Sequence, residues 1–301
     1  MKPYLLLAAF AVPLQIFAQQ IADTTYKAPI KHPHYRHGTG TVVHIDEGHH
    51  NFHTKEGRYK PFSNVLEQDG YRVKEFSGEF TAEKLAGVEI LVIANAVNEA
   101  NNTNWYRPVY SAFTIEEIAA VNKWVNGGGK LFLIADHMPM AGAAKDLAAA
   151  FGFEFTDGFA VDTNSGSAAH FYISDGTLKE NEITRGKDTS EAVTHVATFT
   201  GHAFKIPSDA TPILIFNDKY INYLPDTAWV ITNNTPAYSV KGWSQGAFKK
   251  SGKGKVVAFG EAAMFSAQLT GAKQRKVGMN NGEAPENYRL LLNIIHWLDK
   301  K

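Results

Sequence analysis

The sequence predicts an α/β protein with a doubly wound, mostly parallel sheet and an inserted loop-rich region. Strand-length segments such as Leu131 to Ala135 are apolar without alternation, which is typical of parallel strands that are covered on both faces. Helix-length segments separate these strands along the chain, as in a right-handed succession of strands and helices. Four of these segments end on, or within two residues of, a polar residue: Asp46, Asn95, Asp136 and Glu261. In an open parallel sheet such residues face the ligand crevice.

The central prediction is a helix that starts at Thr114 and a buried strand that follows it. Thr114 and Glu117 have the spacing of a capping box, in which a hydroxyl and a carboxylate satisfy the first free amides of a helix. Three glycines at 127–129 then end the helix. The strand over 131–135 runs into Asp136 and His137.

The same patterns predict the remaining elements in chain order. Before the central helix we expect a strand at 41–46, a helix over 62–66 that ends at 69–70, an edge strand at 71–76 and a strand at 88–94. After it we expect a short helix over 147–151, a strand at 153–155, a loop-rich insertion at about 157–200, strand character at 194–199, 212–216, 228–232 and 236–240, a buried strand at 256–259 and a last helix over 284–298.

Composition excludes several functions. The chain has 30 basic and 30 acidic residues, so no excess positive charge favours nucleic acid as a partner. It has no cysteine, which excludes disulfides, thiolate nucleophiles and cysteine-bound zinc.

The N-terminus has the layout of a secretory signal peptide. A single Lys2 precedes an apolar run from Tyr4 to Phe17, and the small Ala18 follows. The run is shorter than the roughly 20 residues that a spanning helix needs, so no stable membrane anchor is expected. We therefore predict a signal peptide at 1–18, an extended lead-in at 19–38 and a single domain at 39–301 in a periplasmic or secreted protein.

Polar residues at the strand ends define the predicted site. The candidate catalytic residues are Asp46, Asp136, His137 and Glu261, and the candidate substrate-binding residues are Asn95, Asn51, His170 and Trp243. The candidate metal ligands are His49, His50, Asp136 and His137. Imidazole and carboxylate groups suit a divalent metal such as Zn or Mn, which acidifies a bound water. Two carboxylates in different environments can instead divide into a general acid and a general base.

A purely structural interpretation competes with each of these assignments. Asp46 and Asp136 can each accept backbone amides as a helix N-cap, and His170 can be a solvated loop residue. The spacing of His49 and His53 would place both on one helix face, but Gly48 and Asn51 favour a loop there.

Four phrases resemble a known family. They are HIDEGHHNFHT, GGGKLFLIADHMP, GWSQGAFKKSGKGKVVAFGEAAMFSAQ and NYRLLLNIIHWL. Together with the element order, they resemble the class I glutamine amidotransferase-like superfamily, in an exported bacterial branch near the trehalose-utilisation (ThuA-like) proteins. The resemblance implies a flavodoxin-like fold over residues 40–300. It also implies that Asp136, His137 and Met138 occupy the turn where the amidotransferases carry their cysteine, so the thioester chemistry of that superfamily is not expected here.

Three functions remain open at this point. The first is an exported hydrolase-type enzyme that acts on a carbohydrate or a related small polar molecule, with or without a metal. The second is a non-catalytic module that binds a carbohydrate or another small ligand on the same scaffold. Aromatic residues such as Trp105 and Trp243 would stack on sugar rings in either case. The third is a structural partner of an envelope complex, which would predict a large apolar surface outside the crevice.

Overall fold

The computed structural model describes residues 20–163 and 168–300. The predicted signal peptide at 1–18 lies outside these residues. Within the two described ranges, no helix has both the length and the apolar character needed to cross a bilayer.

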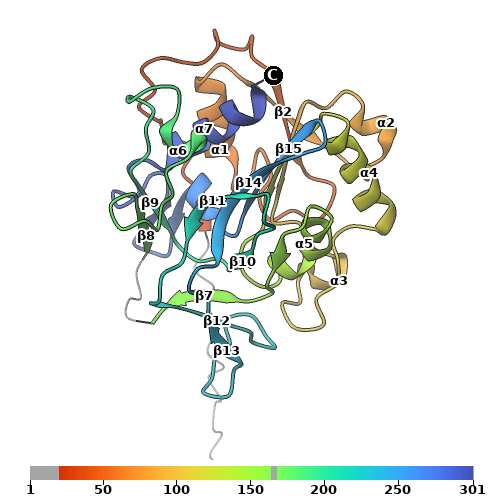
Figure 1. The fold of residues 1–301 in the computed structure, drawn as a ribbon, viewed down its shortest axis with the longest axis vertical. Helices are drawn as coiled ribbons and strands as arrows, with labels where there is room; N and C mark the ends of the chain where they lie inside the picture. Colours follow the sequence, from red (N-terminus) through yellow and green to blue (C-terminus); the bar gives the residue numbers. More distant parts are fainter. Residues whose placement is uncertain (1–19, 164–167, 301) are drawn as a thin grey trace, which may run out of the picture.

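A central mixed sheet organises the molecule (Figure 1). Its strands lie in the order β3-β2-β4-β5-β15-β14-β10-β6, and β11 pairs with β14 beside this path. The first five are parallel: β3 (Arg72–Phe76), β2 (Val42–Asp46), β4 (Ile90–Ala94), β5 (Lys130–Ile134) and β15 (Gly254–Phe259). The other four are antiparallel: β14 (Ser244–Ser251), β10 (Phe204–Lys205), β6 (Glu154–Phe155) and β11 (Thr211–Ile215). The expectation of an α/β protein is thus confirmed, with a mixed sheet.

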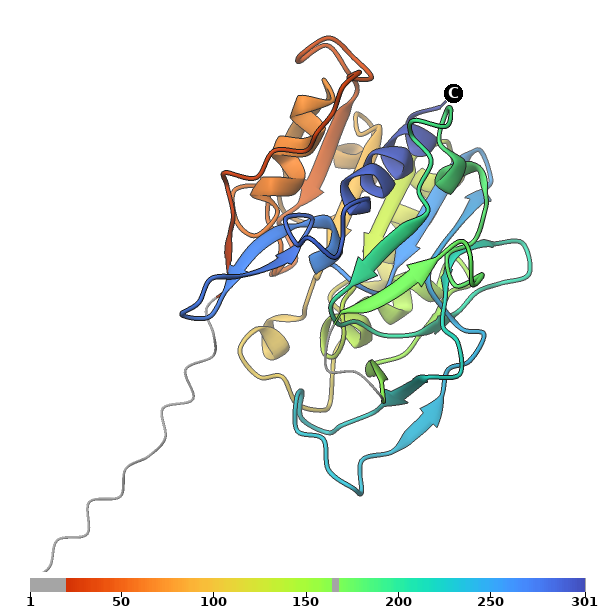
Figure 2. The same ribbon diagram turned by 90° about the vertical axis from the view of Figure 1, so that its left-hand side faces the viewer.

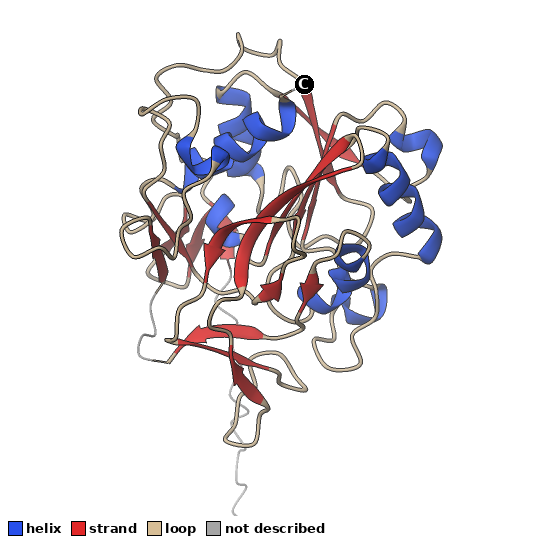
Figure 3. Ribbon diagram, viewed as in Figure 1, coloured by secondary structure: helices blue, strands red, loops and turns tan. Residues whose placement is uncertain are grey.

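Helices lie on both sides of this sheet (Figures 1 and 3). On one side are α1 (Lys60–Gln68), α6 (Glu182–Arg185) and α7 (Asn287–Asp299); on the other are α2 (Ala82–Leu85), α3 (Glu99–Asn102), α4 (Ile115–Asn126) and α5 (Met140–Ala149). Successive residues of β5 point to the two sides. Phe132 belongs to the core under α1 and α7, and Leu131 and Leu133 belong to the core under α4 and α5. This two-sided burial explains why the strand is apolar without alternation.

The capping box before β5 forms as predicted. The Thr114 hydroxyl accepts a hydrogen bond from the Glu117 amide at 3.2 Å, and a Glu117 carboxylate oxygen accepts one from the Thr114 amide at 2.9 Å. The helix ends at Asn126, directly before the three glycines.

Smaller sheets surround the central one. They consist of β1 (Gln20–Ala22) with β16 (Ala267–Thr270) and β17 (Arg275–Gly278); β7 (Phe159–Asp162) with β12 (Tyr220–Tyr223) and β13 (Ala237–Ser239); and β8 (Ala169–Tyr172) with β9 (His195–Thr198). Figure 2 shows the hairpin of β16 and β17 beside β1, and β12 and β13 at the end of the molecule far from the C-terminus.

One prediction about these outer parts was wrong. Residues 228–232 were predicted as a strand and form a loop, because their apolar side chains face outward: Val230 is 56% exposed. The region 157–200, predicted to be rich in loops, contains the short strands β7 and β8, and β9 forms where strand character was predicted at 194–199. The longest strand, β14, was missed because its outer half, with Lys249 and Lys250, is polar.

Candidate functional site

One cavity lies at the carboxyl ends of β4 and β5, and we call it the strand-end cavity. It has a volume of about 780 Å³. Asn95, Asp136 and His137 line it from the ends of the two strands, and Phe52, His53 and Arg58 line it from the loop between β2 and α1. The outer wall comes from β1, β16 and β17. The position beyond the strand ends is the one that ligands occupy in open α/β sheets.

Asp136 and His137 present reactive atoms to this cavity. The Asp136 Oδ1 accepts hydrogen bonds from the His137 amide at 2.8 Å and the Thr200 hydroxyl at 3.1 Å. Oδ2 of Asp136 makes no hydrogen bond within the described part of the chain. The His137 Nδ1 donates to the Met138 carbonyl at 2.6 Å, which fixes the ring and leaves Nε2 as an acceptor in the neutral imidazole.

Aromatic rings surround the His137 imidazole. Phe159 stacks on it with ring centroids 4.4 Å apart, and Trp229 contacts it edge-on at 4.5 Å. Trp105 lies 6.2 Å away and contacts Phe52 at 5.5 Å. Trp229 has φ of 68°, a strained conformation for a bulky residue, and is 51% exposed. Such strain is concentrated at functional sites.

Asn95 connects the two sides of the cavity floor. It also has a left-handed backbone, with φ of 51°, which asparagine tolerates better than most residues. Its Oδ1 accepts a hydrogen bond from the Asp136 amide at 2.8 Å, and its Nδ2 donates to the His53 Nδ1 at 3.0 Å. The Asn95 side chain therefore fixes Asp136 relative to His53.

Asp46 does not line the cavity, because a buried network occupies it. Its carboxylate accepts hydrogen bonds from the His49 Nδ1 at 2.9 Å and the Asn51 Nδ2 at 2.9 Å. The His49 Nε2 lies 2.9 Å from Glu117 Oε1, so one imidazole joins two carboxylates. Burial lowers the pKa of His49, but the hydrogen bonds and charges of Asp46 and Glu117 outweigh it, and the net pKa is raised.

Glu261 is fully buried and also does not line the cavity. Its two carboxylate oxygens accept the amides of Ala263 and Met264, each at 2.8 Å, at the start of the 3₁₀ turn η1 (Ala263–Phe265). Burial and the nearby charge of Asp136 raise the pKa of Glu261 well above its ordinary value. Glu261 therefore caps this turn, and its predicted catalytic role stays a prediction.

The other predicted binding residues are spread over the molecule. Asn95 lines the cavity, whereas Asn51 is held against Asp46. His170 lies on β8 and its Nδ1 is 2.9 Å from the His195 Nε2. Trp243 packs against Tyr238, away from the cavity. Of the residues predicted from the sequence, the structure brings together Asn95, Asp136 and His137.

The predicted metal ligands do not form a group. Within residues 20–163 and 168–300, no three His, Asp or Glu side chains are placed together as a metal ion requires. Both ring nitrogens of His49 contact carboxylates, and His50 is exposed outside the cavity. A metal at these four residues would have to break the His49 network, so the donor set does not fit the predicted ion.

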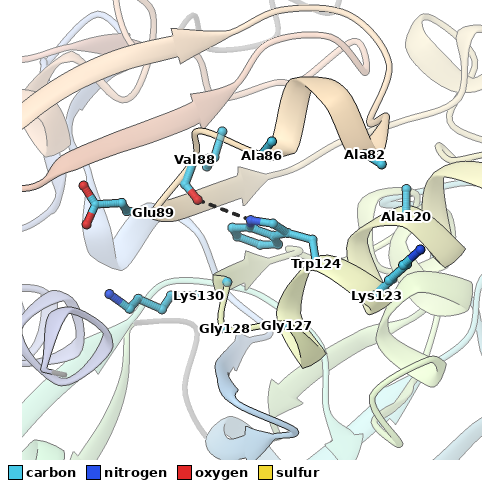
Figure 4. A pocket seen from close by; sticks show the side chains of 11 residues that line it. Ala82, Ala86, Val88, Glu89, Ala120, Lys123, Trp124, Gly127, Gly128 and Lys130 are labelled. Carbon is cyan, nitrogen blue, oxygen red and sulfur yellow. Dashed lines mark hydrogen bonds between the residues drawn. The ribbon is translucent and has the colours of Figure 1, made fainter.

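A second pocket, of about 520 Å³, lies at the amino ends of β4 and β5 (Figure 4). The indole of Trp124 fills its centre and donates a hydrogen bond to the Val88 carbonyl at 3.2 Å. Its charged lining residues are Glu89, Lys123 and Lys130, with no histidine. Because no histidine lines this pocket, it has no counterpart to the Asp136 and His137 pair of the strand-end cavity.

Comparison with known proteins defines the fold only. No family model matches the sequence, and no curated protein matches it. The N-terminal domain of mmIFT52 is similar in structure, with a TM-score of 0.61 and 15% identity over 86% of this chain and 98% of that chain. A cytoplasmic protein of Salmonella typhimurium has a TM-score of 0.50 and 13% identity over 87% of this chain and 100% of that chain.

Similar structures also include a ThuA-like protein from Bacteroides uniformis. Its TM-score is 0.47 and its identity 11%, over 89% of this chain and 93% of that chain. The likeness to the mmIFT52 domain and the Salmonella protein shows the fold alone, and a shared fold does not define a reaction.

Several cavity residues were not identified as such from the sequence. Arg58, Thr200 and Trp229 line the cavity from loops, and nothing in their local sequence marks that position. His53 was noted only for its spacing from His49. A useful signal was present in the aromatic and basic residues that follow the first polar strand end, Phe52, His53 and Arg58.

Proposed function

We propose that the protein is an exported hydrolase-type enzyme that acts on a carbohydrate or a related small polar molecule in the strand-end cavity. The observation that carries this proposal is the neighbouring pair Asp136 and His137, whose Oδ2 and Nε2 make no hydrogen bond in the described residues and which both line the cavity. The aromatic rings of Trp105 and Trp229 beside them favour a ligand with a ring face and polar edges.

In this proposal His137 is the general base. Its Nε2 takes a proton from a water molecule as the water oxygen bonds to the carbon of the scissile C–O bond. That C–O bond breaks, and the proton then passes from Nε2 to the leaving oxygen. The hydrogen bond from Nδ1 to the Met138 carbonyl keeps the ring in the required tautomer. Asp136 Oδ2 orients the water or a substrate hydroxyl. No step uses a metal, because the predicted ligands do not come together.

The finer assignments of fold, family and location are also proposals. The five parallel strands follow the order 2-1-3-4-5 of chain succession, which supports a doubly wound, flavodoxin-like arrangement. The sequence resemblance supports a place near the ThuA-like branch. Export is supported by the N-terminal signal-peptide pattern.

The test is a comparison of turnover and binding in matched variants. Wild type, Asp136→Asn, His137→Gln and the control Asp146→Asn, an exposed residue on α5, are screened on 4-nitrophenyl glycosides and esters. Saccharide binding is measured in parallel by calorimetry. We expect Asp136→Asn and His137→Gln each to lower turnover by about 10² to 10⁴ while binding persists. Asp146→Asn should match wild type.

A different outcome would favour the binding module. If wild type binds saccharides without turning over any substrate, and Trp229→Ala weakens that binding, the cavity is a ligand site without chemistry. If wild type neither binds nor cleaves any member of the panel, the carbohydrate proposal fails in both forms.

A further inference from the structure

The strand-end cavity contains a cation without an anionic partner. Arg58 lies in the loop before α1, with its guanidinium carbon 3.7 Å from the centroid of the Phe52 ring. Its Nη1 donates a long hydrogen bond to the Phe52 carbonyl at 3.4 Å, and its Nε is buried without a partner. No carboxylate pairs with Arg58 anywhere in the described residues. Burial alone lowers the pKa of Arg58. An unpaired, partly buried charge costs free energy.

His53 adds a second donor without a partner at the same place. Its side chain is 3% exposed, and its Nδ1 accepts the hydrogen bond from Asn95. The neutral ring therefore carries its proton on Nε2, which is buried and has no hydrogen-bond partner among the residues described. Burial, and then the charge of Arg58, lower the pKa of His53 to about 3, so the ring stays neutral near pH 7. Arg58 and His53 both line the strand-end cavity.

The two unpaired groups are both donors, which defines the ligand that would satisfy them. A neutral hydroxyl would satisfy one donor and leave the guanidinium charge unpaired. An oxyanion can accept from the Arg58 fork and from a neighbouring N–H at once. The outer wall of the same cavity carries two cations of β17, Arg275 and Lys276, and one carboxylate, Glu283, so its lining is net positive.

We infer that the cavity takes a ligand whose polar ring carries an oxyanion, a carboxylate, sulfate or phosphate, bound at Arg58 and His53. This inference rests on the proposed function and specifies its substrate class as an acidic saccharide. Asn95 connects His53 to the backbone of Asp136, so the oxyanion lies one side chain away from the acid/base pair. Binding of the oxyanion at this subsite then fixes the position of the sugar ring relative to Asp136 and His137.

A purely structural role for Arg58 gives a different expectation. The guanidinium would then serve only to cover Phe52 and to bind its carbonyl. Lysine at this position would keep the charge and lose the fork, whereas glutamine would lose the charge and keep a donor. The two substitutions therefore separate anion binding from packing.

The experiment measures binding of matched probes by calorimetry. The probes are D-glucose, D-glucuronate, D-glucose 6-sulfate, D-glucose 6-phosphate and inorganic sulfate. The proteins are wild type, Arg58→Gln, Arg58→Lys and the control Arg36→Gln, an exposed arginine outside the cavity. We expect wild type to prefer at least one acidic sugar over glucose by about tenfold or more, and added salt to weaken that preference. Arg58→Gln should abolish the preference, Arg58→Lys should keep part of it, and Arg36→Gln should keep all of it.

The outcomes distinguish this inference from the proposed function. Equal binding of glucose and all acidic sugars by wild type, or an unchanged preference in Arg58→Gln, overturns the anion subsite and leaves a neutral-sugar enzyme possible. Arg58-dependent binding of inorganic sulfate without binding of any saccharide keeps the subsite and removes the carbohydrate proposal. If Arg58→Gln does not fold, competition between inorganic sulfate and an acidic sugar on wild type decides, and the absence of competition overturns the inference.

Discussion

His49 joins two carboxylates that lie far apart in the sequence. Asp46 ends β2, and Glu117 begins α4 and also accepts the Phe80 amide at 3.0 Å. Burial raises the pKa of Glu117, but its hydrogen bonds with Thr114, His49 and Phe80 lower it overall. The network is therefore complete when the imidazole is protonated and both carboxylates are ionised. In such buried networks the loss of one partner costs more than the pair contributes.

The charge of His49 predicts a decline in stability at alkaline pH. The folded pKa of His49 lies above its ordinary value of 6.5, so its contribution is fully present below pH 6.5 and is lost as the pH rises through the raised value. The contribution of Glu117 has the opposite dependence: it is present above 4.5 and is lost as the pH falls through the lowered value. His49→Gln should destabilise the protein by about 3 to 5 kcal/mol near pH 6, where it leaves two buried carboxylates unpaired.

The measurement is the free energy of unfolding in denaturant from acidic to alkaline pH. The difference between wild type and His49→Gln should shrink as the pH rises from 6.5 to the raised folded pKa of His49, because the unfolded imidazole releases its proton in that range while the folded one still holds it. The exposed His50→Gln is the control and should follow wild type throughout. A constant difference between His49→Gln and wild type would show that the charge of His49 does not matter.

At the scale of single elements, the helix α4 packs on the central sheet and also contributes Glu117 to the His49 network. Thr114 caps the helix and its hydroxyl lies 3.1 Å from the Glu117 carboxylate that also holds His49. Thr114→Ala should lower the free energy of unfolding by about 1 to 2 kcal/mol, as is usual for an N-cap. Thr114→Ser keeps the hydroxyl and should restore most of that loss. Chemical denaturation of the three proteins checks this, and equal stability of the Ala and Ser variants would contradict a capping role.

The elements that were predictable from the sequence are those with a strong local pattern. A few consecutive residues are enough to predict the cap at Thr114, the glycines after α4 and the apolar strands β4 and β5. Strand β14 has no such local pattern, because its outer half is polar. The loop at 228–232 has the apolar pattern of a strand but does not form one. Neither can be assigned without the tertiary packing that overrides local propensity.

The candidate site was predictable only in part, and for a physical reason. Asp46, Asp136 and Glu261 all lie at or just beyond the carboxyl ends of buried strands, yet only Asp136 lines the cavity. The direction of a side chain after a strand depends on the turn that follows: at Glu261 the chain enters η1 and the carboxylate caps it. The residues that complete the cavity, Arg58 and Trp229, come from loops whose paths are set by distant contacts.

At the scale of the whole molecule, buried neutral histidines set the lower pH limit of the fold. His53 and His202 are almost completely buried, and burial lowers the pKa of each to about 3. An unfolded histidine binds its proton below about 6.5, so their contribution to stability is fully present above that value and is lost as the pH falls toward 3. Each contributes on the order of 5 kcal/mol to this decline. Because His49 acts in the opposite direction, stability should be greatest near neutral pH.

Removing one of these histidines should flatten the acid limb of the stability profile. His202 packs against Phe155 and Phe204, with ring centroids 4.7 and 5.8 Å away, and it does not line the strand-end cavity. Leucine has a similar volume and no titrating group, so His202→Leu should reduce by about one the number of protons taken up on unfolding between pH 4 and 6. The slope of the unfolding free energy against pH measures this number directly, whatever the absolute stability of the variant. The exposed His37→Gln serves as the control and should retain the wild-type slope. If His202→Leu also retains it, the acid sensitivity of the fold lies elsewhere, and the burial of a neutral His202 does not limit stability at low pH.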